Sequence, residues 1–264
     1  MKKISDYIIC FFAFTVFLPI AVLVLWAFGK RWPWPYIIPA EFSLRGFTYF
    51  ISGVNTISIV LYSILLSTVV TLAALAISIP AARALGLYEF KGKGLFKMLV
   101  LLPLIISPVA TALGIQVFFI RLGLAGTFMG VVLVHLVPCL PYGIRILSDV
   151  FEALGESIEL QARTLGANKI KTFLYVTMPL ISPGLISAGA LIFIVSFSQY
   201  FLTFIIGGGN VVTLTMAMFP FIQSGDRNTA SCYSVVFILT TFILLYIVER
   251  KVKVKYLSEN NFYL

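Results

Sequence analysis

The side chains that most often carry out chemistry are few in this chain and lie far apart. His135 is the one histidine, and the three cysteines, Cys10, Cys139 and Cys232, show no metal-site spacing. The sequence has neither an HExxH nor a GxSxG motif. We therefore expect no catalytic residue and no metal ligand. The cysteines are interpreted as small core residues, and His135 as a packing residue or, alternatively, as part of a solute path.

Uncharged polar side chains gather in one apolar stretch, between positions 196 and 203. An amide such as that of Gln199 needs a partner there, either on another helix or in a water-filled path. At helical spacing Gln199 and Thr203 share one face with Ser196. Lining of a pathway and packing between helices both remain open as roles for this face. The pathway candidates are Ser196, Ser198, Gln199, Tyr200, Thr203 and His135.

Charged residues avoid the middle of the apolar stretches, and the ten acidic residues lie at their ends or between them. A charge at the bilayer centre costs about 2.5–3.5 kcal/mol, so ion-coupled carriers keep one there only for function. If the chain moves a solute, we expect the energy to come from another subunit. The excess of 19 basic over 10 acidic residues is attributed to membrane topology, and no nucleic-acid partner is expected.

The elements that hold these residues require a lipid bilayer around them. Of the 264 residues 60% are hydrophobic and 11% charged, and the mean hydropathy is +1.04. A soluble domain has roughly 25% charged residues, so soluble enzymes, disordered chains and disulfide-stabilised secreted domains are excluded. We expect an all-α integral membrane protein with one domain over 1–264. Six transmembrane helices of about 20 residues are predicted, over 7–28, 56–79, 95–120, 127–147, 184–206 and 232–248.

Basic residues set the expected orientation. Lys and Arg are concentrated in the segments that share a side with the two termini, among them 83–97 and 250–255. Because cytoplasmic segments carry the excess of Lys and Arg, both termini are predicted to be cytoplasmic. The long connection over about 148–182 then lies on the cytoplasmic side as well.

This cytoplasmic connection is the most informative segment of the sequence. Residues 157–165 are amphipathic and helix-favouring, and Gly166 can end such a helix by adopting a positive φ. A second short helix is predicted over 168–177, with Asn168 as its N-cap, and the prolines from Pro179 on are expected to end it. The pair is either an idle interfacial element or a docking element for a cytoplasmic partner.

The connection resembles the EAA signature of the permease subunits of binding-protein-dependent ABC importers. The residues that match the signature are Ala162, Gly166, Ala167, Met178 and Pro179. Leu160 stands where the family has glutamate, and Glu159 lies one residue earlier. The resemblance assigns coupling to an ATPase to Glu159, Ala162, Arg163, Gly166, Ala167, Asn168, Lys169 and Pro179.

The resemblance implies a MetI-like ABC permease fold, with a core over about 56–248 and a cytoplasmic coupling helix. In such an importer the coupling helix fits a cleft of a dimeric cytoplasmic ATPase, which binds ATP and Mg, so this chain itself needs no cofactor. A second six-span permease subunit, either a copy or a paralogue, encloses the path. An extracytoplasmic solute-binding protein delivers the solute, and the assembly lies in the bacterial cytoplasmic (inner) membrane.

The function that the resemblance implies is inward transport of a small polar solute, without enzymatic activity in this chain. The sequence is most similar to the spermidine/putrescine, ferric-iron and thiamine permeases, and a polyamine-type or thiamine-like solute is expected. Many polyamine permeases carry an acidic residue near Ser198 and Gln199, and this chain has none there. The alternatives are an ion-coupled secondary carrier, a membrane-embedded enzyme or a structural assembly factor.

Overall fold

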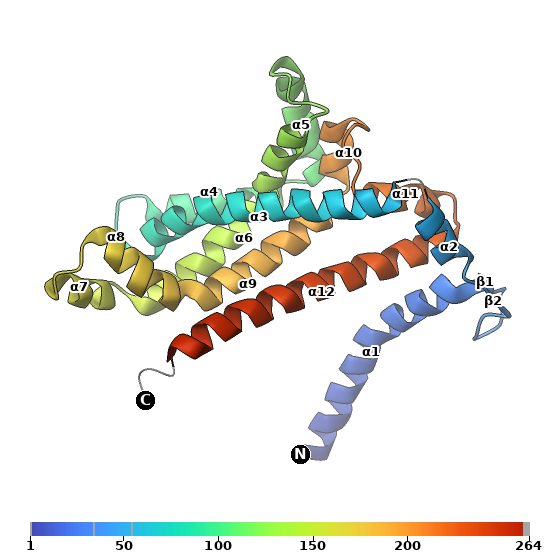
Figure 1. Cartoon of the computed structure of the whole chain (residues 1–264), viewed down its shortest axis with the longest axis horizontal. Helices are drawn as coiled ribbons and strands as arrows, with labels where there is room; N and C mark the ends of the chain where they lie inside the picture. The colour runs from blue at the N-terminus through green and yellow to red at the C-terminus, as the bar shows by residue number, and fades with distance from the viewer. Residues whose placement is uncertain (1, 34, 54, 261–264) are drawn as a thin grey trace. The chain divides into compact units, whose positions relative to one another are not determined.

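The computed structural model describes residues 2–33, 35–53 and 55–260, with side chains described at 11, 12, 14–33, 35–53 and 55–250. Most of these residues are helical (Figure 1). The chain divides into two compact units, one made of Met1–Val60 and Leu214–Ile243, the other of Leu61–Thr213 and Leu244–Leu264. The single domain over 1–264 stays a prediction.

The first unit joins the N-terminal helix to helices from near the other end of the chain. Its elements are α1 (Lys2–Phe28), β1 (Gly29–Arg31), β2 (Glu41–Phe42), α2 (Arg45–Ser52), α11 (Leu214–Gln223) and the first part of α12 (Arg227–Asn260). The strands form a short antiparallel hairpin. Asn228 closes the end of α1, because its Nδ2 donates to three carbonyl oxygens. These belong to Trp26, Ala27 and Gly29, at 3.2, 3.0 and 3.1 Å.

The second unit is built around α6 (Phe128–Leu154). Its other elements are most of α3 (Thr56–Leu87), α4 (Lys93–Ile105), α5 (Pro108–Arg121), α7 (Ser157–Thr164), α8 (Lys169–Thr172), η1 (Phe173–Thr177), α9 (Met178–Phe197), α10 (Phe201–Gly207) and the end of α12. Among the membrane-length helices α6 is the most buried, and it packs along α9 and against α4, α5 and α10. Side chains of α6 therefore reach most other helices of this unit.

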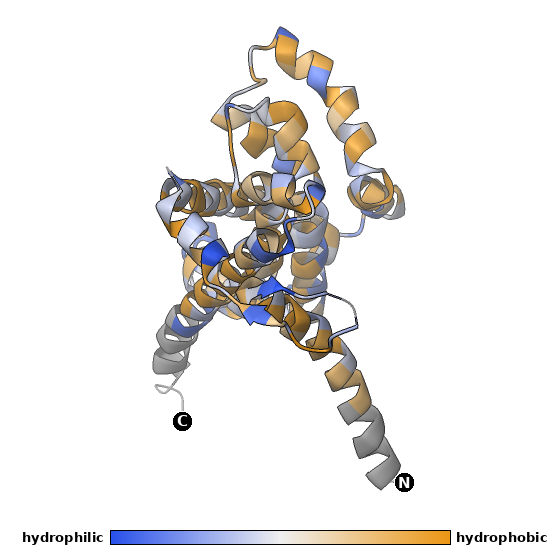
Figure 2. Ribbon diagram, turned by 90° about the vertical axis from the view of Figure 1, so that its right-hand side faces the viewer, coloured by the Kyte–Doolittle hydropathy of each residue, from blue (hydrophilic) through white to orange (hydrophobic). Residues whose placement is uncertain are grey.

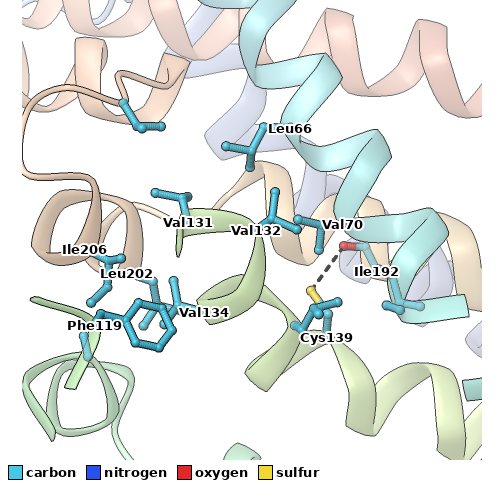
Figure 3. Close-up of a cluster of buried hydrophobic side chains, with 14 residues drawn as sticks. Leu66, Val70, Phe119, Val131, Val132, Val134, Cys139, Ile192, Leu202 and Ile206 are labelled. Atoms are coloured by element: carbon cyan, nitrogen blue, oxygen red, sulfur yellow. Dashed lines mark hydrogen bonds between the residues drawn. The ribbon is translucent and has the colours of Figure 1, made fainter. Parts of the chain in front are cut away.

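Apolar side chains around α6 hold the helices of the second unit together (Figure 3). The labelled members come from α3, α5, α6, α9 and α10, and they are Leu66, Val70, Phe119, Val131, Val132, Val134, Cys139, Ile192, Leu202 and Ile206. Small residues allow the closest approach: a Cβ on Gly86 would lie 2.7 Å from the Phe151 Cβ, and one on Gly184 2.7 Å from Val150. Such contacts are typical of helix packing in membranes.

Four helices of the described chain are long and apolar enough to cross a membrane. They are α3, α6, the continuous helix Lys169–Phe197 and the Arg227–Arg250 part of α12. Hydrophobic residues cover much of the helix surfaces (Figure 2). The all-α membrane class is thus confirmed, whereas the count of six spans stays a prediction. The first predicted span, 7–28, lies within α1, Lys2–Phe28.

The third predicted span, 95–120, is wrong as a single helix. The helix is interrupted between α4 and α5, whose directions differ by 96°. The two helices make up one span only if a bent pair of helices is counted as a single span. Ile106 and Ser107 are extended, with ψ of 135° and 131°, and Pro108 begins α5. A proline disfavours the helical conformation of the residue before it, which explains the position of the break.

The fifth predicted span, 184–206, is wrong at both ends. The helix begins at Lys169 and continues to Phe197, so Pro179 does not end it. Pro179 lies in the first turn of α9, directly after the wide π-helical turn of η1. A π-helical turn changes the hydrogen-bonding register locally, so the proline fits without a break. At the other end, residues 198–200 separate α9 from α10.

Candidate functional site

The turn between α7 and α8 has the geometry that its sequence predicts. Gly166 has a φ of +92°, the left-handed conformation that glycine adopts without a Cβ penalty. Its N–H donates to the Arg163 carbonyl at 3.0 Å, and the Ala167 N–H donates to the Ala162 carbonyl at 3.1 Å. These bonds close the end of α7. The predicted stop at Gly166 is confirmed.

The start of α8 is also as predicted. The Asn168 side chain accepts a hydrogen bond from the Lys171 N–H at 2.8 Å, which satisfies one of the free N–H groups of a helix start. From there the helix runs without interruption into α9. The coupling loop is therefore shorter than the predicted 148–182, because α6 reaches Leu154 and the next membrane-length helix begins at Lys169.

Large apolar side chains project from this short loop. Leu160, Leu165 and Ile170 are 53%, 88% and 70% exposed, and we call these three residues the loop surface. Arg163, Lys169 and Lys171 are exposed around them. Contiguous exposed apolar surface is typical of interaction sites, so these side chains are candidates for a contact with a partner. Sequence reasoning missed Leu165 and Ile170, although the signal was present as apolar residues beside the glycine turn in a charged segment.

Glu159 does not belong to the loop surface, because it is only 9% exposed. Its carboxylate forms an ion pair with Arg83 of α3 and accepts a hydrogen bond from the Thr177 hydroxyl at 2.8 Å. The Arg163 Nη2 lies 3.7 Å from the same carboxylate. We call Glu159, Arg83, Thr177 and Arg163 the Glu159 cluster. Sequence reasoning missed Arg83 and Thr177, which lie far from Glu159 along the chain.

The polar candidates of the fifth predicted span meet His135 of α6. His135 is fully buried, with Nδ1 3.0 Å from the Ser196 Oγ and Nε2 2.9 Å from the Thr203 Oγ1. The Thr203 hydroxyl donates to the Gln199 carbonyl at 3.1 Å. A neutral ring that donates from Nε2 to Thr203 and accepts at Nδ1 from Ser196 satisfies all three bonds. We call His135, Ser196 and Thr203 the His135 cluster.

The single helix predicted through Ser196, Gln199 and Thr203 is wrong, because the helix breaks between them, although Ser196 and Thr203 still meet at His135. α9 ends at Phe197 and α10 begins at Phe201. The Ser198 hydroxyl donates to the Val195 carbonyl at 3.1 Å, a local bond that competes with helix continuation. Ser198 is exposed, and Gln199 and Tyr200 are half-buried. Backbone that is not helical has polar groups that need a partner in the protein or in water, so this break is the candidate lining segment.

Metal ligation has no geometric support in the part of the chain that the structure describes, where no three His, Cys, Asp or Glu side chains come together. Cys139 and Cys232 are buried free thiols, and the Cys139 Sγ donates to the Ile192 carbonyl at 3.7 Å (Figure 3). The side chain of Cys10 lies outside the described residues. The two described cysteines pack in the protein interior.

Known proteins similar in sequence are transport permeases, although no family model matches the chain. The 2-aminoethylphosphonate transport system permease protein PhnV of Salmonella typhimurium is 29% identical over 239 residues, 90% of this chain and 89% of PhnV. The putrescine transport system permease protein PotI of Escherichia coli is 26% identical over 193 residues, 69% of each chain. The trehalose/maltose transport system permease protein MalG of Thermococcus litoralis is 33% identical over 139 residues, 52% of this chain and 50% of MalG.

Two solved structures share the fold. A chain of a bacterial ABC transporter involved in the import of the acidic polysaccharide alginate matches with a TM-score of 0.72 and 17% identity, over 94% of this chain and 95% of that one. A chain of the alginate transporter in complex with its periplasmic protein bound to an alginate pentasaccharide matches with a TM-score of 0.64 and 13% identity, over 94% and 91%. Both matches extend over nearly the full length.

Proposed function

Since the chain is homologous to the permease proteins of ABC transport systems and has the fold of an ABC importer permease, we propose that it couples ATP hydrolysis in a separate subunit to solute import. The ATPase is a dimeric cytoplasmic protein that binds ATP and Mg. The chain lies in the bacterial inner membrane with both termini in the cytoplasm, and a second permease subunit and an extracytoplasmic binding protein complete the transporter.

The loop surface carries this proposal. Leu165 and Ile170 are 88% and 70% exposed, and they stand on a turn fixed by Gly166 and Asn168. A turn that presents exposed apolar groups, with exposed Arg and Lys in the same segment, fits an apolar cleft that carries acidic residues. The ATPase supplies that cleft, and Ala162, Arg163, Ala167 and Lys169 lie at the contact.

The solute passes the break between α9 and α10. Ser198, Gln199 and Tyr200 carry hydroxyl and amide groups and no charge, which suits a small polar solute. A polyamine or a thiamine-like solute would then be bound without an acidic counter-charge at this segment. The names of PhnV and PotI refer to two such solutes, 2-aminoethylphosphonate and putrescine. In this arrangement Ser196, Thr203 and His135 fix the position of residues 198–200 from the side away from the solute.

Replacing Leu165 by aspartate tests the contact with the ATPase. We expect L165D to insert into the membrane but to lose ATPase during purification of the complex, because a charge replaces the most exposed apolar group of the loop surface. The matched control is Ile37→Asp, since Ile37 is 89% exposed and lies on another loop. Retention of the ATPase by L165D at the level of I37D would contradict the proposal.

The transport activity itself is tested in proteoliposomes with labelled putrescine and 2-aminoethylphosphonate. We expect uptake only when permeases, ATPase, binding protein and ATP are all present. Uptake that an ion gradient drives without nucleotide would identify a secondary carrier instead. Failure of both solutes to be carried or to compete would exclude this class of amine-bearing substrates.

A further inference from the structure

The Glu159 cluster lies behind the loop surface and connects α7 to the rest of the second unit. Among the described residues of α7, Glu159 is the one that is buried. This eight-residue helix packs against α8 and η1, and its one buried side chain is that of Glu159. Any displacement of α7 therefore acts on the groups that bind the Glu159 carboxylate.

Those groups belong to two long helices. Arg83 lies near the end of α3, and Thr177 lies in the continuous helix Lys169–Phe197, which leads to the break at 198–200. The Thr177 hydroxyl is buried, and the π-helical turn of η1 directly precedes α9. π-helical turns are frequent at functional sites. A long helix moves largely as a rigid element, so displacement at Thr177 extends along α9 toward the candidate pathway.

We propose that Glu159 is a positioning residue that transmits movement of the loop surface to α3 and α9 through Arg83 and Thr177. The inference rests on the proposed function, because it requires a partner that moves α7. It differs from a direct contact between Glu159 and the ATPase, and it assigns to coupling two residues, Arg83 and Thr177, that lie outside the coupling set expected from the sequence.

Arg83 has a feature that suits this role. Its Nε is buried without a hydrogen-bond partner among the described residues, while an Nη2 atom makes the ion pair with Glu159. The guanidinium group presents five donors in a fixed plane. The Nε–H of Arg83 can therefore donate to another acceptor when α7 moves. The ion pair with Glu159 can then change its geometry while the guanidinium keeps a polar partner.

The test measures ATP hydrolysis and solute uptake on the same assembled transporter in proteoliposomes. The variants are Glu159→Gln, Thr177→Val and the double exchange Arg83→Glu with Glu159→Arg. The matched control is Arg145→Gln, since Arg145 pairs with Asp149 at 3.2 Å on the surface, with side chains 58% and 57% exposed. The quantity compared is the number of ATP molecules hydrolysed per solute carried.

We expect the transporter with E159Q to keep its ATPase bound. It should hydrolyse at least about five times as much ATP per solute carried as the native transporter, which corresponds to the lower end of typical coupling free energies. T177V should show a smaller increase, R145Q none, and the double exchange should restore part of the coupling. A normal ratio in both E159Q and T177V would overturn the proposal. A parallel fall of hydrolysis and uptake without rescue would also overturn it, since that pattern is expected of a purely structural ion pair.

Three further outcomes are informative, and the last two separate this inference from the proposed function. If E159Q does not assemble, T177V decides, because that variant removes one hydroxyl and keeps the volume nearly unchanged. If L165D keeps its ATPase, the proposed function fails whatever E159Q does. If L165D loses its ATPase while E159Q and T177V couple normally, the proposed function stands and the transmission through Glu159 is wrong.

Discussion

The Glu159 cluster and the His135 cluster join helices of the same unit with different chemistry. In the first, a carboxylate of α7 binds a guanidinium of α3 and a hydroxyl of η1. In the second, an imidazole of α6 binds hydroxyls on either side of the break after α9. Formal charge is thus used at the loop, and neutral groups are used within the apolar stretch, where a charge costs several kcal/mol.

Because their chemistry differs, the two clusters respond differently to the loss of a partner. Removal of one partner from a buried ion pair leaves an uncompensated charge, so the Glu159 cluster responds strongly to any separation of its members. Neutral hydroxyls can return their bonds to their own helix, so the His135 cluster tolerates change and mainly fixes a conformation. The first is suited to transmitting force, the second to holding the segment at 198–200 in place.

Replacing Arg83 by methionine should have the largest effect on stability. The Glu159 carboxylate, with a side chain 11% exposed, would lose its nearest charge, at a cost of about 3 kcal/mol. The measurement is the thermal unfolding midpoint of the purified protein in detergent, with Arg145→Met as the exposed control. Equal midpoints for the two variants would remove the distinction between buried and surface charge.

Replacing His135 by leucine should cost less, about 1–2 kcal/mol, because two neutral hydrogen bonds between helices are lost. Ser196→Ala and Thr203→Val each remove one of these bonds and should each produce about half of the shift in the same thermal measurement. A shift for H135L as large as that for R83M would show that the neutral cluster contributes as much as the charged one.

A substitution at Gly166 tests the turn of the loop without touching a charge. A Cβ there meets no atom within 4 Å, but the φ of +92° is unfavourable for other residues by about 1–2 kcal/mol. We expect G166L to insert normally and to lose transport-coupled ATP hydrolysis, and G166A to show a weaker loss. The control is Gly94→Ala, a helical glycine that is equally free of neighbours, and loss of coupling there too would make the result unspecific.

The Gln199→Leu variant should have the smallest effect on stability and a clear effect on transport. Gln199 is half-buried in the break, and the proposed function places its amide on the solute path. The measurement is uptake kinetics at unchanged ATPase content. Uptake kinetics equal to those of the native chain would assign Gln199 to helix packing and would leave Ser198 and Tyr200 as the lining residues.

Local features of the loop could be predicted from the sequence. The stop at Gly166 and the N-cap at Asn168 depend on the backbone preferences of neighbouring residues, and both are confirmed. The break before Pro108 has the same local origin, although the sequence did not distinguish it from Pro138 and Pro141, which lie inside α6. Tertiary packing decides which proline a helix tolerates.

Contacts between distant residues could not be predicted in the same way. Arg83 and Glu159 are 76 positions apart, and an exposed loop acid and a buried one have the same sequence pattern. His135 also required the structure, because the sequence allowed both packing and pathway interpretations. The fifth predicted span failed because hydropathy measures apolar length, whereas the break at 198–200 depends on side-chain bonds to the backbone.

The amide of Asn228 has a consequence for biosynthesis. It binds the last carbonyl oxygens of α1, some 200 positions earlier in the chain, and a Cβ on Gly46 would lie 2.9 Å from its Oδ1. The ribosome makes the helix that ends at Phe28 long before Asn228 exists. The end of α1 therefore cannot form these hydrogen bonds until nearly all of the protein has been translated. Until then it is hydrated or bound by the insertion machinery.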